Sequence, residues 1–91
     1  MNDERNDNFV GGLKMTVYHV TTVKKLNKYL SNGKILPPVR AWENIEQAER
    51  MSKSTGRKII LRLKFPDNAE KLEGHFSQAR VLHEPYILDS I

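Results

Sequence analysis

His19 and the threonines that follow it are the residues of this chain whose types and spacing best suit ligand chemistry. His19 lies at the end of an expected strand over residues 16–20, and Thr21 or Thr22 is placed to cap a helix directly after it. Backbone N–H groups in the first turn of that helix, a hydroxyl and an imidazole can converge there on a phosphate or a ribose. The alternative interpretation is that His19 is a structural or surface histidine of the strand.

Two helices are expected to position these groups. Apolar residues recur at helical spacing from Val23 to Leu30, and an Asn-Gly pair at residues 32–33 supplies a left-handed stop. The second helix is expected to begin after Asn44, which resembles a capping box with the glutamine three residues later, and to stop at Gly56. Both helices are short, and the first is amphipathic.

Strands account for most of the remainder. Residues 58–65 alternate apolar and polar side chains and form the clearest strand, and residues 79–83 form another. Two consecutive prolines make residues 34–41 an extended connection, whereas residues 68–72 are predicted as a brief helical turn. Apolar residues within 86–91 are expected to dock the C-terminus. This order predicts an α+β domain with a small, mainly antiparallel sheet and two short helices.

Composition sets residues 1–14 apart from the rest. They are rich in asparagine and acidic residues, so they are predicted to be a disordered, dispensable extension, with Met15 as an internal start and residues 15–91 as one domain. The whole chain has 15 basic and 11 acidic residues, a net charge of +4. The first fourteen residues hold two of the basic and three of the acidic ones, so the folded part has a net charge of +5.

Several classes of protein are excluded by the residue types present. The chain has no cysteine, which excludes a disulfide framework, a thiolate nucleophile and zinc sites built on cysteine. His75 and His83 have no partner at metal-ligand spacing, so no metal site is predicted. No apolar run approaches the roughly 20 residues that cross a bilayer, and the acidic start differs from a secretion signal. We therefore expect a cytoplasmic protein with no membrane partner.

Three segments resemble the ADP-ribosyltransferase-like fold, a broad group that includes toxin transferases and tRNA 2′-phosphotransferases. They are Tyr18-His19-Val20-Thr21-Thr22 with the helix that follows, Arg40-Ala41-Trp42 with the next helix and strand, and residues 79–91, which are similar to the family's closing strand and tail. The resemblance implies a reduced version of that fold. It also implies that His19 contacts the ribose of NAD, that Thr21 lies beside it and that Trp42 stacks on nicotinamide.

The catalytic glutamate of most transferring members has no match. It is expected near the start of the closing strand, where residues 78–80 are Gln, Ala and Arg, and Glu73 and Glu84 are displaced by several residues. One positioned group of this kind is worth several kcal/mol of transition-state stabilisation, so ADP-ribosyl transfer is left open. Phosphotransferase members use histidine and arginine groups instead, and guanidinium forks match phosphate oxygens. Arg40, with Arg62 and Arg80, is a candidate for that role.

Binding of NAD or another phosphorylated nucleotide is the expected function, in a cleft lined by His19, Thr21 and Trp42. His19 is the catalytic candidate, and Trp42 as a core residue is the alternative. A second hypothesis is a non-enzymatic basic module for nucleic acid or an acidic protein, and a third is a small toxin-like effector. The second predicts salt-sensitive binding that is lost on charge reversal of Lys53, Arg57 and Arg62.

Overall fold

An antiparallel sheet organises the part of the chain that the computed structural model describes, residues 13–72 and 79–88. Among these residues the sheet has five strands, in the spatial order β4 (Ile59–Pro66), β1 (Lys14–Thr21), β3 (Val39–Trp42), β6 (Ala79–Leu82) and β5 (Glu70–Lys71). A smaller sheet pairs β2 (Lys34–Ile35) with β7 (Tyr86–Ile87), and the described helices are α2 (Val23–Asn32) and α3 (Ile45–Thr55). The predicted α+β class, with a mainly antiparallel sheet and two short helices, is confirmed.

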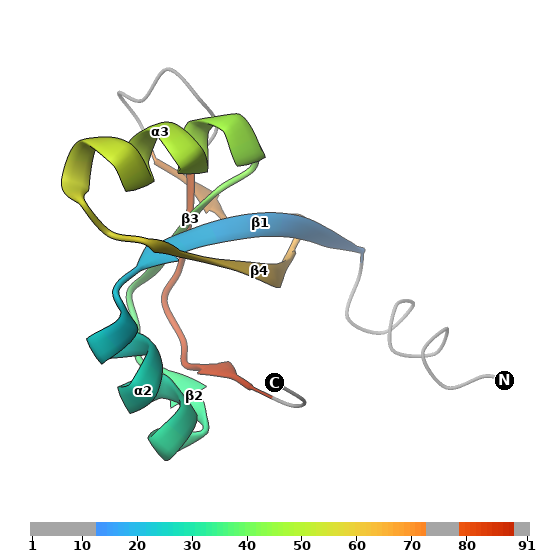
Figure 1. Ribbon diagram of the computed structural model, residues 1–91. Helices are drawn as coiled ribbons and strands as arrows, with labels where there is room; N and C mark the ends of the chain where they lie inside the picture. The colour runs from blue at the N-terminus through green and yellow to red at the C-terminus, as the bar shows by residue number, and fades with distance from the viewer. Residues whose placement is uncertain (1–12, 73–78, 89–91) are drawn as a thin grey trace, which may run out of the picture.

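The five-stranded sheet lies between two layers. Helix α3 covers one face, and α2 with the β2–β7 pair covers the other (Figure 1). On the α2 face the buried core consists of Val17, Ile35, Val39, Ala41, Leu63 and Phe65. On the α3 face, Ala48 of the helix is fully buried. Each of the larger core side chains stabilises the fold by about 1.5–3 kcal/mol through burial.

The β1–β4 ladder is the most extensive pairing of the sheet. It runs through eight residue pairs, from Lys14 opposite Pro66 to Thr21 opposite Ile59. Because side chains alternate between the two faces, His19 lies on the same face as the core residue Val17. The strand predicted over residues 58–65 is confirmed, with its bounds shifted by one residue.

The predicted helix ends are also confirmed. Of the two threonines considered as the first cap, Thr22 is the N-cap of α2, and its hydroxyl accepts a hydrogen bond from the Lys25 N–H at 3.1 Å. Asn44 caps α3 through its side-chain oxygen, which accepts from the backbone N–H two residues later at 2.7 Å. Gly33 and Gly56 end the helices at φ 75°, a left-handed conformation that favours glycine.

Three segments differ from the sequence-based expectation. Residues 34–41 are extended as predicted, but they contribute β2 and the central strand β3. Residues 68–72, predicted as a helical turn, contain the short strand β5, because Glu70 and Lys71 pair with β6. Lys14 belongs to β1, one residue before the predicted domain boundary. Residues 1–12 and 89–91 lie outside the described residues, as do Glu73, His75 and Gln78.

Candidate functional site

The sheet opens between β1 and β3, and His19 lies at the opening. The two strands are paired at Tyr18 and Trp42, whereas β1 and β4 pair along their full length. One residue past that pair, the His19 side chain reaches across to β3, where its Nδ1 donates to the Arg40 carbonyl at 2.7 Å. The His19 imidazole thus links β1 to β3 next to the pair formed by Tyr18 and Trp42.

The bond to Arg40 also fixes the tautomer of His19. A carbonyl can only accept, so Nδ1 carries the proton and Nε2 of the neutral ring is an acceptor. The Tyr29 hydroxyl of α2 lies 3.1 Å from Nε2 and donates to it. The Tyr29 oxygen in turn accepts from the Thr21 hydroxyl at 3.2 Å. Thr21, Tyr29, His19 and the Arg40 carbonyl therefore form one directed hydrogen-bond chain.

The electrostatic setting keeps His19 uncharged. Burial lowers the pKa of His19 below its ordinary value of 6.5, the hydrogen bond to the Arg40 carbonyl raises it, and the positive charges of Lys25 and Arg57 lower it further. The net effect is a lowered pKa, so the ring is neutral near pH 7. The positive charge beside His19 therefore comes from lysine and arginine side chains, among them Lys25 and Arg57.

A groove of about 760 Å³ runs through the opening. Helix α2, the 34–38 segment, β3 and the C-terminal end of α3 all contribute to its walls. Its cationic lining residues are Lys25, Lys28, Lys34, Arg40 and Arg57. Among the described residues that line it, no side chain is a carboxylate. Apolar surface is contributed by Trp42, Leu36, Pro37 and Met51, among others. The groove therefore combines positive charge with aromatic and apolar walls.

Three of the four predicted site residues line this groove. They are His19, Arg40 and Trp42. Thr21 does not line it: the residue is 1% exposed, and its hydroxyl reaches the groove only through Tyr29.

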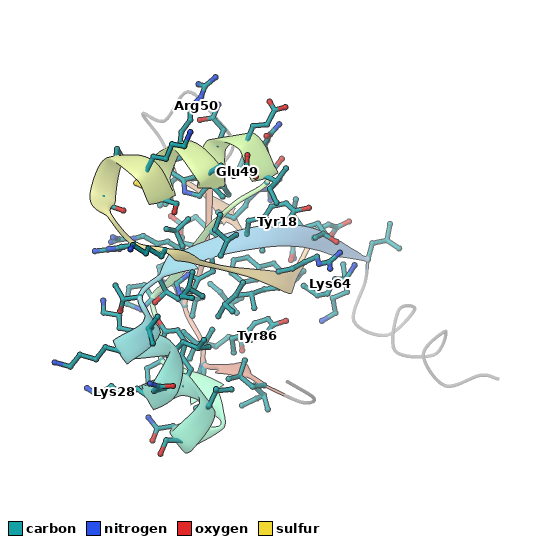
Figure 2. All side chains as sticks on the ribbon, viewed as in Figure 1. Tyr18, Lys28, Glu49, Arg50, Lys64 and Tyr86 are labelled. Carbon is teal, nitrogen blue, oxygen red and sulfur yellow. The ribbon has the colours of Figure 1, made fainter. Side chains whose placement is uncertain are left out.

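The strand register separates His19 from Trp42 within the groove. Trp42 is opposite Tyr18 and shares its face, and Tyr18 lies on the α3 side of the sheet in Figure 2. His19 follows Tyr18 in the strand and lies on the α2 face. The two rings thus line one groove from opposite faces of the sheet.

Arg80 occupies the region where the family resemblance places a glutamate, and it has a structural role. Its side chain is 11% exposed and forms an ion pair with Glu43. It also donates to the carbonyls of Asp67 and Ala69, at 3.1 and 2.7 Å. Arg80 therefore stabilises the turn before β5 through its hydrogen bonds, and it does not line the groove.

The other displaced candidates do not reach the groove either. Glu84 is exposed in the turn after β6 and lines a different hollow. Arg62 is exposed on β4 and is not among the groove residues. Of the three arginines considered for phosphate, only Arg40 lines the groove.

Sequence reasoning missed Tyr29 and most of the cations. Tyr29 lies within the predicted helix from Val23 to Leu30, and the available signal was that a buried tyrosine hydroxyl needs a polar partner. Lys25 and Lys28 are exposed on α2. Whether exposed lysines line a groove depends on how separated segments meet, which local spacing does not reveal.

Two further features bear on the kind of site. Among the described residues, no group of three or more possible ligands gathers to hold a metal ion. Neither of the helices in the described ranges is long and apolar enough to cross a membrane. No family model, curated protein or solved structure matches the chain.

Proposed function

We propose that the groove binds a phosphorylated nucleotide, with NAD as the first candidate, and that the protein acts as a nucleotide-binding domain. The observation that carries this proposal is the charge of the groove: five cationic side chains and no carboxylate among its described lining residues. A ligand with two adjacent phosphates suits such a lining, because each phosphate oxygen can accept charge-assisted hydrogen bonds from lysine or arginine.

The apolar walls support a nucleotide over a simple anion. Trp42 offers an aromatic surface, and Leu36 and Pro37 offer apolar surface in the same groove. Bases stack on aromatic side chains at about 1–3 kcal/mol each. The volume of about 760 Å³ falls within the range of roughly 300–1,000 Å³ that is typical of small-molecule sites.

Binding, as opposed to ADP-ribosyl transfer, is the activity that the groove chemistry favours. Transfer needs a group that stabilises positive charge as nicotinamide leaves, and the described lining supplies cations. The Nε2 atom of His19 already accepts from Tyr29, so it is not a free base. His19 is better suited to holding the strands and Tyr29 in place beside a ligand.

Ligand titration tests the proposal directly. Trp42 is the single tryptophan of the chain and lines the groove, so its fluorescence should report ligand entry. We expect saturable changes with NAD and with ADP-ribose, weakened by added salt, and much weaker binding of adenosine, which lacks phosphate. Absence of any saturable change with NAD or ADP-ribose at millimolar concentration would refute the proposal.

A matched pair of variants locates the binding. Lys25→Gln with Arg57→Gln removes two charges from the groove, whereas Arg50→Gln with Lys53→Gln removes two charges from α3 residues that line a separate hollow. Figure 2 shows Arg50 on the outer side of α3. The groove variant should bind at least about tenfold more weakly, and the control should bind normally. Equal losses in both variants would indicate non-specific attraction.

The nucleic-acid hypothesis is the second candidate, and the net charge of the folded part favours it. Its expected footprint is divided, because Arg57 lines the groove while Lys53 lines a hollow shared with Glu46 and Glu49. A single-stranded oligonucleotide in the same titration separates the two. Saturable oligonucleotide binding that both variants weaken equally, together with no saturable NAD binding, would favour nucleic acid over a nucleotide.

A further inference from the structure

The outer edge of β4 is a second surface with the chemistry of a binding site, and it is independent of the groove. Strand β4 stands at the end of the sheet order, with β1 on its inner side. Among the described strands, none pairs with its outer side. At eight residues, β4 offers a long edge for an added strand.

One hydrogen bond shows which backbone groups of β4 point outward. The Lys64 N–H donates to the Tyr86 hydroxyl at 2.9 Å, so it points away from β1. In an antiparallel ladder, alternate residues point their N–H and C=O groups to the same side. The backbone groups of Ile60 and Arg62 therefore point outward as well, and they have no hydrogen-bond partner within the described part of the chain.

The side chains of β4 are mixed on one face, where Ile60 alternates with Arg62 and Lys64, and apolar on the other. Arg62 and Lys64 are exposed on the α3 face of the strand, and Lys64 Nζ donates to the Thr16 hydroxyl at 2.8 Å. Ile59 and Leu61 are half-buried on the opposite face. Strand β4 contains no acidic residue. An added strand would meet Ile60 with Arg62 and Lys64 on one face and apolar side chains on the other.

We propose that the β4 edge binds an extended segment of a partner protein in which acidic residues alternate with apolar ones. Side chains of an added strand alternate between faces, so one set would lie beside Ile60 and Arg62, with Lys64 next along the strand, and the other set beside Leu61. Opposite charges directly across a strand pair stabilise it, and like charges destabilise it. The Tyr86 hydroxyl occupies the edge at Lys64, so the free part is centred on residues 59–63.

A second copy of this chain fits the edge poorly. Antiparallel pairing of two β4 edges centred on Arg62 would set that arginine opposite its own copy. A register centred one residue earlier would set Arg62 opposite Ile60 and Lys64 opposite Lys58. The first register sets two arginines opposite each other and the second sets two lysines opposite each other, so a partner of opposite charge is favoured.

An acetylated octapeptide of alternating glutamate and valine is a direct probe. We expect saturable shifts of the Ile60 and Arg62 amide signals in NMR spectra of the full chain, with slower hydrogen exchange at both amides. A peptide with the same composition in two blocks, four glutamates then four valines, should bind at least about fivefold more weakly. Equal binding of the two peptides, or shifts confined to groove residues, would overturn the proposal.

Two variants and a modified peptide complete the experiment. Arg62→Glu should weaken binding of the alternating peptide about fivefold or more, and Lys71→Glu on β5, at the opposite edge of the sheet, should leave it unchanged. A peptide N-methylated at alternate residues on its pairing side should lose binding, because it lacks the required donors. Retained binding of the methylated peptide would overturn strand addition even if Arg62→Glu disturbed folding. Nucleotide titration of the groove is unaffected by either result, so the two proposals fail separately.

Discussion

Tyr29→Phe is the sharpest test of the hydrogen-bond chain at the groove. The substitution removes one oxygen atom and keeps the ring, which packs against the core cluster and lies 5.8 Å from the His19 ring between centroids. Hydrophobic packing is therefore preserved. What is lost is the hydroxyl that accepts from Thr21 and donates to His19.

The expected cost follows from the burial of the two partners. Each hydrogen bond contributes about 1 kcal/mol net, and a buried hydroxyl left without a partner costs about 1–3 kcal/mol. Thr21 is 1% exposed and has no access to water, whereas His19 is half-buried and lines the groove, where water can replace the lost donor. Most of the penalty should thus come from Thr21, for a total of about 2–3 kcal/mol. For a domain of this size that corresponds to a fall in Tm of roughly 10–20 °C.

Urea unfolding followed by circular dichroism measures this loss. Tyr18→Phe is the matched control, because the Tyr18 hydroxyl has no hydrogen-bond partner among the described residues, and its removal should change stability by less than about 0.5 kcal/mol. Adding Thr21→Val to Tyr29→Phe removes the stranded hydroxyl and should recover part of the loss. A Tyr29→Phe cost no larger than that of Tyr18→Phe would refute the chain.

Three further predictions concern stability. The pKa of His19 in the folded protein lies below its unfolded value of 6.5, so the unfolded state binds the proton first as the pH falls. The free energy of unfolding should therefore decrease as the pH drops below about 6.5. Urea midpoints measured across this range should lose this component of the pH dependence in His19→Gln. Glu43→Gln leaves the largely buried Arg80 guanidinium without its carboxylate partner and should lower the free energy of unfolding in urea by about 2 kcal/mol. Glu70→Gln, in the exposed pair with His83, is the control and should lower it by less than about 0.5 kcal/mol. Thr22→Ala removes the α2 cap and should cost about 1 kcal/mol by the same measurement, with Thr22→Ser restoring most of it.

Local chemistry explains why so much of the fold was predictable. Caps and stops act within a few residues of themselves, so Thr22, Asn44 and the two left-handed glycines mark helix ends directly in the sequence. Alternation in residues 58–65 likewise records the two faces of β4. These signals depend on neighbours along the chain, and the structure follows them closely.

The misread segments depend on partners distant in sequence. Glu70 and Lys71 become a strand because β6, about ten residues later, pairs with them, and nothing in residues 68–72 indicates that partner. The groove has the same origin. Its cations come from α2, β2, β3 and the residue after the α3 cap, and they gather because β1 and β3 diverge beyond Tyr18. His19 was identified from its place at a strand end, whereas Tyr29 needed the packing of α2 against the sheet.

The geometry of His19 decides which substitutions can inform on function. The divergence of β1 from β3 opens the groove, and the His19 imidazole bridges that divergence through the Arg40 carbonyl while holding Tyr29. Loss of ligand binding in His19→Ala would therefore follow equally from a lost ligand contact or from a relaxed groove. Lys25 and Arg57 are exposed, and the hydrogen-bond chain does not include their side chains. Their substitution changes the charge of the groove and leaves its scaffold intact, so binding measured on those variants distinguishes an anion site from a structural histidine.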